Sequence, residues 1–517
     1  MEYVLIDEKS FMPYKMKFYT DRSAAVTYRE IADQCVKGIL ALWDDHYLDI
    51  NTLEGNIFQH KFDGNDVILK HEYLFAMDYL SNCLTAYEKT REKIYKETFE
   101  KIIDQFHEYL ERNGPVYEDL AVYAQTLLII KAYDIFGQFS HINDFLDLLM
   151  KYAYWLMDDS NYQGNNNHGL FQDLALLHIS VFLGDSADAC TWKRHAVKRV
   201  RQLFETAYYD DFTNNENSII YFQFNNYMYE QIFEFCNYYG ITDIKHIEER
   251  LERSKEALIT FAHKDGSFPV IGDGRVFNCE KSNHSSCLFP DLGMAVLKIK
   301  ETYLSFKNKT VYQSHAHVDV SSITARYKDI DFLIDSGQCN YDRYTPTNRY
   351  MRSSVGHTGI FPVFADGMFL GEFCDSLEYA EITSYECDET KAYVRGEYRL
   401  KDIQVVREVI VFPNEIKIKD KWSCGKPTMM RQRFIIPKEL IENSTFTVSR
   451  RTLTSKVGNV NFKFEIKSEK TRALTVVQFG IAAPQYNSYE ETMLLDTFAE
   501  NALDGEISVK ITFWEDE

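Results

Sequence analysis

The sequence has 517 residues, which is too long for one compact domain and predicts two, with three as the upper alternative. Its formal net charge of −21 argues against nucleic acid as a partner, because phosphates would be repelled by most of the surface. No stretch approaches the ~20 apolar residues of a membrane span, and residues 1–16 lack the apolar core of a signal peptide. We therefore expect a cytoplasmic protein. A periplasmic or secreted protein stays open as the alternative, because a trimmed signal peptide would leave no trace.

From about residue 24 to 264 the hydrophobic pattern is helical, with apolar residues recurring every three or four positions. Short breaks rich in Gly, Asn and Asp separate these predicted helices. Helices with such short connections pack antiparallel to their neighbours, which predicts a solenoid or a closed (α/α) toroid. The periodicity does not choose between the two. The later helices are expected at 118–136, 142–158, 169–183, 187–208, 225–239 and 243–263.

After Asp265-Gly266-Ser267-Phe268-Pro269 the pattern changes to an alternation of apolar and polar residues. Ile416 with Ile418, and the runs at 462–466 and 507–513, are typical of half-buried antiparallel strands. This pattern predicts that residues from about 285 to 517 form an all-β sandwich. The expected domains are 1–284, helical, and 285–517, β, with a site most naturally between them.

The stretch Ser314-His315-Ala316-His317-Val318-Asp319 is predicted to be a β-strand with its two histidines and Asp319 on one face. Two imidazoles placed together predict a metal site, an acid/base site or both. Asp335 follows at the end of an apolar run, and His357 comes after a further segment. Two of these histidines with a carboxylate and a water would complete a tetrahedral site for Zn²⁺.

Two other motifs carry candidate chemistry. In Gly164-Asn165-Asn166-Asn167-His168-Gly169, Asn167 either caps the helix beginning near Leu170 or, with His168, faces an anion at that helix N-terminus. On spacing alone the cap is favoured. Tyr221 lies in the apolar run 219–224, where on its own it is equally explained as a core aromatic.

The segment 340–352 is predicted to be a loop, and it carries three arginines against one aspartate. Such local positive charge in an acidic chain is a candidate clamp for carboxylate or sulfate groups, for which the guanidinium fork is suited. The alternative is a solvated surface loop. The candidate substrate-binding residues are Arg343, Arg349 and Arg352.

Seven short blocks follow one another between about residues 167 and 360. They are Asn167-His168-Gly169-Leu170; Glu216-x-Ser218-x-x-Tyr221; Asp265-Gly266-Ser267-Phe268-Pro269 with Ile271-Gly272-Asp273; Phe289-Pro290-Asp291-x-Gly293; His315-x-His317-x-Asp319; Asp335-x-Gly337; and Arg352-Ser353-Ser354 leading to His357. In their residues and their order these blocks resemble the heparinase II/III-like polysaccharide lyases.

The resemblance implies an N-terminal incomplete (α/α) toroid followed by a C-terminal antiparallel β-sandwich. It implies β-elimination of an anionic polysaccharide or oligosaccharide that contains uronic acid, leaving a 4,5-unsaturated uronate end. A glycosaminoglycan is the expected substrate, and an alginate-type chain is the alternative. A homo-oligomer stays open.

Carried over by position, Asn167 would neutralise the substrate carboxylate and Tyr221 would act as base, acid or both. His168 and His315 would be further acid/base or carboxylate-binding residues. The positions that hold a structural divalent metal, expected to be Zn²⁺, in some members are matched by His317, Asp335 and His357. The sequence departs from the common pattern at Phe222, Ala316 and Thr358.

Two other functions compete with a lyase. An (α/α)-toroid glycoside hydrolase would need two carboxylates flanking the bond, about 6.5–9.5 Å apart in an inverting enzyme. Glu118, Asp119 and Glu216 can be nominated, but nothing in the sequence singles them out. A non-catalytic protein that binds acidic sugars would explain the aromatic residues and the arginines, but not Tyr221 with the paired histidines.

Overall fold

A computed structural model describes residues 27–43, 46–64, 67–164, 166–184, 186–274, 278–279, 285–312, 315–442, 451–485 and 488–516. Asn165 and Ser314, which belong to the motifs above, lie outside these ranges, as does residue 284 at the predicted domain boundary. The chain divides into two compact units. We call them the helical unit, Met1–Ala207 with Tyr227–Glu249, and the β unit, Tyr208–Asn226 with Arg250–Glu517.

The segment Tyr208–Asn226, which carries Tyr221, groups with the β unit and not with the helices that precede it. The domain ranges expected from the sequence, 1–284 and 285–517, remain a prediction.

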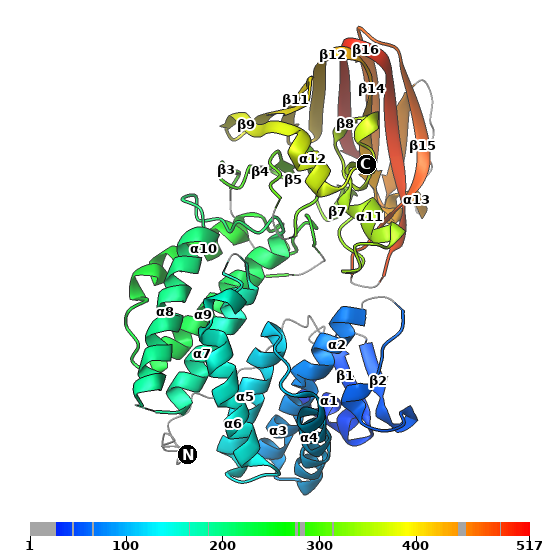
Figure 1. Ribbon diagram of the computed structural model, residues 1–517. Helices are drawn as coiled ribbons and strands as arrows, with labels where there is room; N and C mark the ends of the chain where they lie inside the picture. Colours follow the sequence, from blue (N-terminus) through cyan, green and yellow to red (C-terminus); the bar gives the residue numbers. More distant parts are fainter. Residues whose placement is uncertain are drawn as a thin grey trace. The chain divides into compact units, whose positions relative to one another are not determined.

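The helices fall where the 3.6-residue pattern predicts them, most within two residues of the expected ends (Figure 1). Helix α5 is buried from Leu120 to Ala132, which explains its apolar character on every side. The bounds are α1 Tyr28–Val36, α2 Val67–Ala76, α3 Asp78–Thr90, α4 Lys93–Asn113, α5 Asp119–Phe136, α6 Ile142–Met157, α7 His168–Phe182, α8 Ala187–Ala207, α9 Ile219–Tyr238 and α10 Lys245–Thr260.

Two expectations about this part of the chain are wrong. The helix expected at 225–239 begins six residues earlier, so Tyr221 lies in the first turn of α9. Residues predicted to be helical also include a hairpin of β1, Ile39–Trp43, and β2, His46–Asp49. The run Ile39–Trp43 is too short and too uniformly apolar for its period to separate strand from helix.

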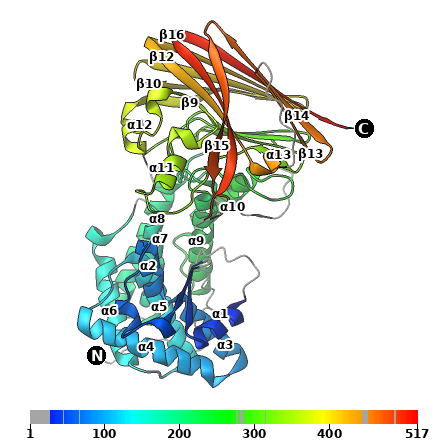
Figure 2. The ribbon, with the colours of Figure 1, turned by 90° about the vertical axis from the view of Figure 1, so that its right-hand side faces the viewer.

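The β unit holds two antiparallel sheets. The smaller has five strands in the order β3-β4-β5-β6-β7. The larger has nine, in the order β13-β14-β16-β12-β11-β10-β9 with β15 on β16 and β8 on β12, and most of its strands are labelled in Figure 2. Their bounds are β3 Cys287–Phe289, β4 Met294–Ile299, β5 Thr302–Lys307, β6 Ser322–Tyr327, β7 Ile330–Leu333, β8 Ile360–Pro362, β9 Leu377–Cys387, β10 Ala392–Leu400, β11 Ile403–Phe412, β12 Glu415–Ile436, β13 Thr452–Val457, β14 Val460–Glu469, β15 Ala473–Ala482 and β16 Glu490–Glu515.

Both sheets contribute to one hydrophobic core. Leu304 and Ile323 come from the five-stranded sheet, and Val409 and Ile511 from the nine-stranded sheet; all four are buried. The alternation predicted for 416–418, 462–466 and 507–513 is confirmed in β12, β14 and β16, whose apolar positions face this core. In the described part of the chain, no helix combines the length and apolarity needed to cross a bilayer.

The prediction that the stretch around His315 forms a strand is wrong. Residues 315–319 connect β5 to β6 without strand structure, and His315 has a φ of +60°. A residue in this left-handed region turns the chain, so alternate positions no longer share a face. Asp319 pairs with Lys307, its Oδ2 lying 2.6 Å from Nζ, whereas both histidines contact Asp273.

The segment 340–352 is only partly a loop, which corrects the prediction. Its second half forms helix α11, Pro346–Arg352, with Thr345 as its N-cap and proline in its first turn. Both features are typical helix starts. Two short helices accompany it in the β unit, α12 at Leu370–Ser376 and α13 at Lys438–Glu442.

Candidate active site and metal group

Three cationic or titratable side chains of the β unit converge on Asp273. Its carboxylate accepts hydrogen bonds from Arg352 Nη1 at 2.5 and 2.7 Å, one to each oxygen. His315 Nδ1 lies 3.0 Å from Oδ2, and His317 Nε2 lies 2.6 Å from Oδ1. Burial alone would raise the pKa of the Asp273 carboxyl, but Arg352 and the two imidazoles hold this pKa well below its ordinary value.

Because Asp273 is ionised, each histidine donates the ring N–H that faces it. In a neutral ring this fixes the tautomer, so that the acceptor nitrogen is Nε2 in His315 and Nδ1 in His317. His315 Nε2 lies 3.9 Å from Glu216 Oε2. One carboxylate thus orients a histidine of the candidate active site and a histidine of the candidate metal group.

Gly272 explains how Asp273 comes so close to this turn. Gly272 has a φ of +65°, and a Cβ there would lie 2.6 Å from the carbonyl oxygen of Asn217 and 3.1 Å from that of His315. Only glycine fits this conformation and this close approach. Glycine at position 272 therefore allows the backbone to approach this turn closely enough for Asp273 to make its contacts.

Tyr221 lies directly against His315. The two rings are stacked with centroids 3.3 Å apart and planes 13° apart. The Tyr221 hydroxyl is hydrogen bonded to the hydroxyl of Tyr341, which precedes α11. Two phenol hydroxyls and an imidazole with a fixed tautomer are thereby gathered in one place, which supplies groups able to remove and return a proton.

Asn167 and His168 lie at the start of α7 in the helical unit. Asn167 occupies the N-cap position but makes no side-chain cap bond, and instead Asn166 Oδ1 accepts from His168 N at 2.9 Å. The Asn167 side-chain oxygen is buried without a hydrogen-bond partner among the described residues. The cap favoured on spacing alone is therefore wrong for Asn167.

His168 is held by Asp119, whose Oδ2 lies 2.9 Å from Nδ1. Burial would lower the pKa of His168, but Asp119 raises it overall. The neighbouring Glu118 caps α5, its carboxylate accepting from Leu120 N at 3.3 Å and Ala121 N at 2.8 Å. Glu118 and Asp119 thus have local structural partners.

The pKa of Glu118 gives a testable pH dependence. Burial and then Asp119 raise this pKa from 4.5 to about 8. Between these values the folded state binds more protons than the unfolded state, so the free energy of unfolding falls as the pH rises. We expect Glu118→Gln, which keeps a capping oxygen, to flatten the fall in Tm between pH 5 and 8. The matched control is the exposed Glu111→Gln, and equal slopes in both variants and the wild type would contradict the assignment.

His317, Asp335 and His357 form a buried group that fits a metal ion. One ligand atom from each lies within 4.8 Å of the others. His357 Nδ1 lies 2.7 Å from Asp335 Oδ2. His317 Nδ1 and His357 Nε2 are buried without a hydrogen-bond partner among the described residues. Each such nitrogen costs about 1–3 kcal/mol when unsatisfied, which a bound cation would offset.

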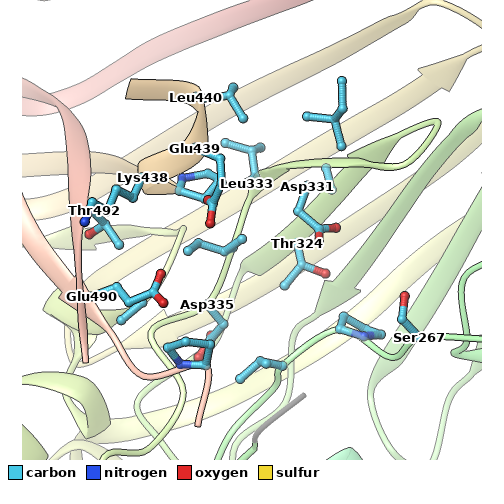
Figure 3. A pocket seen from close by; sticks show the side chains of 18 of the residues that line it. Ser267, Thr324, Asp331, Leu333, Asp335, Lys438, Glu439, Leu440, Glu490 and Thr492 are labelled. Carbon is cyan, nitrogen blue, oxygen red and sulfur yellow. The ribbon is translucent and has the colours of Figure 1, made fainter. Parts of the chain in front are cut away.

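A cavity of about 470 Å³ lies in the β unit, and Asp335 is part of its wall. Figure 3 shows the carboxylates of Asp331, Glu439 and Glu490 around this space, with Asp335 at its lower end. Burial raises the pKa of Asp331 to about 6. Asp335 therefore belongs both to the wall of this cavity and to the metal group.

The three candidate arginines have different surroundings. Arg343 and Arg349 are exposed, and the guanidinium of Arg349 lies 4.5 Å from the ring centre of Phe369. Arg352 is engaged by Asp273, and its Nη2 also donates to the Ala316 carbonyl at 3.0 Å. Their part in substrate binding stays a prediction.

Sequence reasoning missed two residues of this cluster. Asp273 appeared only as part of a block, and Tyr341 only as part of the arginine-rich segment. Asp273 is 42 residues from His315, and Tyr341 is 120 residues from Tyr221. The closeness of Asp273 to Gly272 was the one available signal, because glycine marks places where backbones approach closely.

A helical unit, together with a β unit whose two sheets share one core, defines a protein with a helical domain and a β-sandwich domain. Residues 71–292 match the family described as Heparinase II/III N-terminus. The predicted resemblance to the heparinase II/III-like family is confirmed. No curated protein matches the sequence.

Several solved structures share the fold. A structure of heparinase III is 12% identical, with a TM-score of 0.81 over 99% of this chain and 88% of the other. A mutant of the heparan sulfate lyase HepC of Pedobacter heparinus is 14% identical, with a TM-score of 0.71 over 99% and 87%. The chondroitin AC lyase of Streptomyces coelicolor is 8% identical, with a TM-score of 0.59 over 98% and 81%. These likenesses confirm the predicted fold class, an incomplete (α/α) toroid followed by an antiparallel β-sandwich.

Proposed function

We propose that the protein is a polysaccharide lyase that cleaves a uronic-acid-containing glycosaminoglycan by β-elimination. The observation that carries the proposal is the stacking of Tyr221 on His315, whose tautomer is fixed by Asp273. Support from outside the chain is the shared fold with a heparan sulfate lyase and with a chondroitin AC lyase in complex with chondroitin sulphate. The family match at 71–292 agrees with this assignment.

The chemistry explains why these residue types are useful. In a 4-linked uronate the C5 proton lies next to an ionised carboxylate and is barely acidic. Its removal adds negative charge to the carboxylate oxygens, so donors aimed at them favour the transition state over the ground state. A base must reach C5, and an acid must protonate the departing O4.

Tyr221 and His315 are the proposed pair for these proton transfers. If the proton and the leaving group lie on the same side of the sugar ring, Tyr221 serves both ends. If they lie on opposite sides, His315 through Nε2, or His168, is the base and Tyr221 the acid. Tyr341 would hold the Tyr221 hydroxyl in place through their hydrogen bond.

The remaining assignments rest on the sequence resemblance. Asn167 would donate to the substrate carboxylate, and its unpaired buried oxygen agrees with a side chain that is not used as a helix cap. Arg343 and Arg349, which are exposed, would contact acidic groups of the polysaccharide. Arg352 would act mainly by holding Asp273.

We further propose that the ion of the metal group is Zn²⁺ and that its role is structural. Two imidazole nitrogens and a carboxylate suit Zn²⁺, which would bind through His317, Asp335 and His357. Bound there, it would fix the turn that carries His315, because His317 is two residues further along the chain. The ion would link the three segments that carry His317, Asp335 and His357, and the protein side chains would carry out the proton transfers.

This proposal predicts the effect of removing the metal. We expect His357→Ala to contain less zinc than the wild type and to have a lower Tm, and we expect a chelator to lower the Tm of the wild type by more than that of the variant. Zinc content measured by elemental analysis with thermal unfolding checks both. His263→Ala is the matched control, because His263 is also buried in the β unit but binds Ser267 and Arg326. Wild-type zinc content in His357→Ala would reject the metal group.

One experiment separates the lyase from its competitors. The protein is incubated with heparan sulfate, chondroitin sulfate, hyaluronan and alginate, and ultraviolet absorbance is followed. A lyase produces the absorbance of the 4,5-unsaturated uronate, a hydrolase produces reducing ends without it, and a binding protein produces neither. The surroundings of Glu118 and Asp119, a helix cap and a histidine partner, give the hydrolase little support.

A further inference from the structure

Two histidines of the helical unit lie face to face, apart from the residues assigned above. The rings of His107, on α4, and His141, at the N-cap of α6, have centroids 3.7 Å apart and planes 7° apart. The lone pair of a ring nitrogen lies in the ring plane, so one of the two rings turns out of this stack when both bind a single ion. A neutral imidazole is the form that binds a metal ion.

Each of the two histidines lies next to an aspartate of the other helix segment. Asp104 and His107 are three residues apart on α4, as His141 and Asp144 are at the start of α6, and this spacing puts each pair on one helix face. His107 Nε2 lies 3.0 Å from Asp144 Oδ2, and His141 Nε2 lies 3.5 Å from Asp104 Oδ1. Asp144 Oδ2 is also 3.9 Å from His141 Nδ1. The two helices therefore present two imidazoles and two carboxylates to one another.

The backbone and the packing below hold these side chains in place. His141 has a φ of +60°, a backbone conformation that is uncommon for residues other than glycine. It occupies the N-cap position of α6 but makes no side-chain cap bond. Its ring contacts α4 and does not cap its own helix. Beneath it, Phe106 of α4 and Phe145 of α6 are stacked with centroids 6.2 Å apart and planes 6° apart. This contact fixes the separation of the two helices where the histidines meet.

We infer that His107, His141 and Asp144 form a second zinc site, which links α4 to α6. One ligand atom from each lies within 4.8 Å of the others. In a tetrahedral zinc site with bonds of about 2.1 Å, ligand atoms are roughly 3.4 Å apart. The separations of Asp144 Oδ2 from the two histidine nitrogens, 3.0 and 3.9 Å, bracket that value. A water molecule takes the fourth position.

In this site Asp104 does not bind the ion but orients one of its ligands, His141. Its contact with His141 Nε2 leaves Nδ1 of that ring for the metal, the arrangement in which a second carboxylate orients a metal-binding histidine. The side chains of His141 and Asp144 are 39% and 63% exposed, so an ion enters directly from solvent. The site is independent of the proposed lyase reaction and stabilises the helical unit.

Zinc binding to the metal-free full-length chain tests this inference. Isothermal titration with Zn²⁺ alone is expected to show one equivalent that is absent from His107→Ala and from His141→Ala. Asp104→Asn is expected to weaken that equivalent about tenfold, because it removes only the orienting carboxylate. His195→Ala is the matched control, since His195 Nε2 lies 3.4 Å from Asp159 in the same unit, and it is expected to bind as the wild type does.

A local measurement separates this site from the buried group of the β unit. Zn²⁺ is expected to protect His107 and His141 from diethylpyrocarbonate in the wild type and in His357→Ala, with modification read by mass spectrometry. Mg²⁺, which prefers oxygen ligands, is expected to give no protection. Equal modification of both histidines with and without Zn²⁺, or an unchanged number of zinc equivalents in His107→Ala, would overturn the inference.

Discussion

Tyr221→Phe is expected to lower kcat for formation of the unsaturated uronate by about 10²- to 10⁴-fold and to leave Tm nearly unchanged. The phenylalanine ring keeps its stacking on His315, but the hydroxyl that would carry the proton, and its bond to Tyr341, are lost. Because the group acts in the transition state, kcat is expected to fall much more than KM rises. Initial rates of ultraviolet absorbance with the best of the four polysaccharides measure both constants.

Tyr327→Phe is the matched control for this prediction. Tyr327 belongs to the same unit, is buried, and stacks on Phe513 with centroids 4.6 Å apart, so its substitution makes the same chemical change away from the cluster. We expect wild-type kinetics for it. Tyr341→Phe removes the partner of the Tyr221 hydroxyl and is expected to have an intermediate effect. A Tyr221→Phe enzyme with wild-type kcat would exclude this residue from proton transfer.

The fold was largely predictable because its two parts have different hydrophobic periods. Helices such as α5 and α6 are long enough for a 3.6-residue pattern to be read. Strand β14, and the parts of β12 and β16 at 416–422 and 505–513, alternate because one face of each packs on the core. The hairpin of β1 and β2 was missed because its first strand is a short apolar run without a readable period. The choice of a toroid over a solenoid came from the family blocks.

The site was less predictable, because its geometry depends on contacts between residues far apart in the chain. The sequence indicated correctly that His315 and His317 lie near each other, but the reason for it, a shared face of a β-strand, was wrong. They meet through the two oxygens of Asp273 after a left-handed turn, and not on one face of a strand. No periodicity reports such a turn, because it is set by the fit of Gly272 against the His315 carbonyl.

The second large effect is expected for Asp273→Asn, which keeps the size of the side chain and removes its charge. Arg352 then loses its charged partner, and the amide can no longer accept from both imidazoles and the guanidinium. Breaking a buried pair in this way costs about 3–5 kcal/mol of the free energy of unfolding. The tautomer of His315 is no longer fixed, so kcat of the protein that does fold is expected to fall by about 10²-fold or more.

Asp420→Asn separates lost stability from lost chemistry. Asp420 accepts from Arg407 Nε and Nη2, each at 2.7 Å, in a pair that is fully buried within the nine-stranded sheet. We expect a similar loss of stability in both variants by urea unfolding, but a fall in kcat per folded molecule only in Asp273→Asn. Equal kcat in the two variants would mean that Asp273 only holds the fold together. A loss confined to Asp273→Asn would instead make the buried carboxylate, which contacts His315 Nδ1, the residue that positions His315 for catalysis.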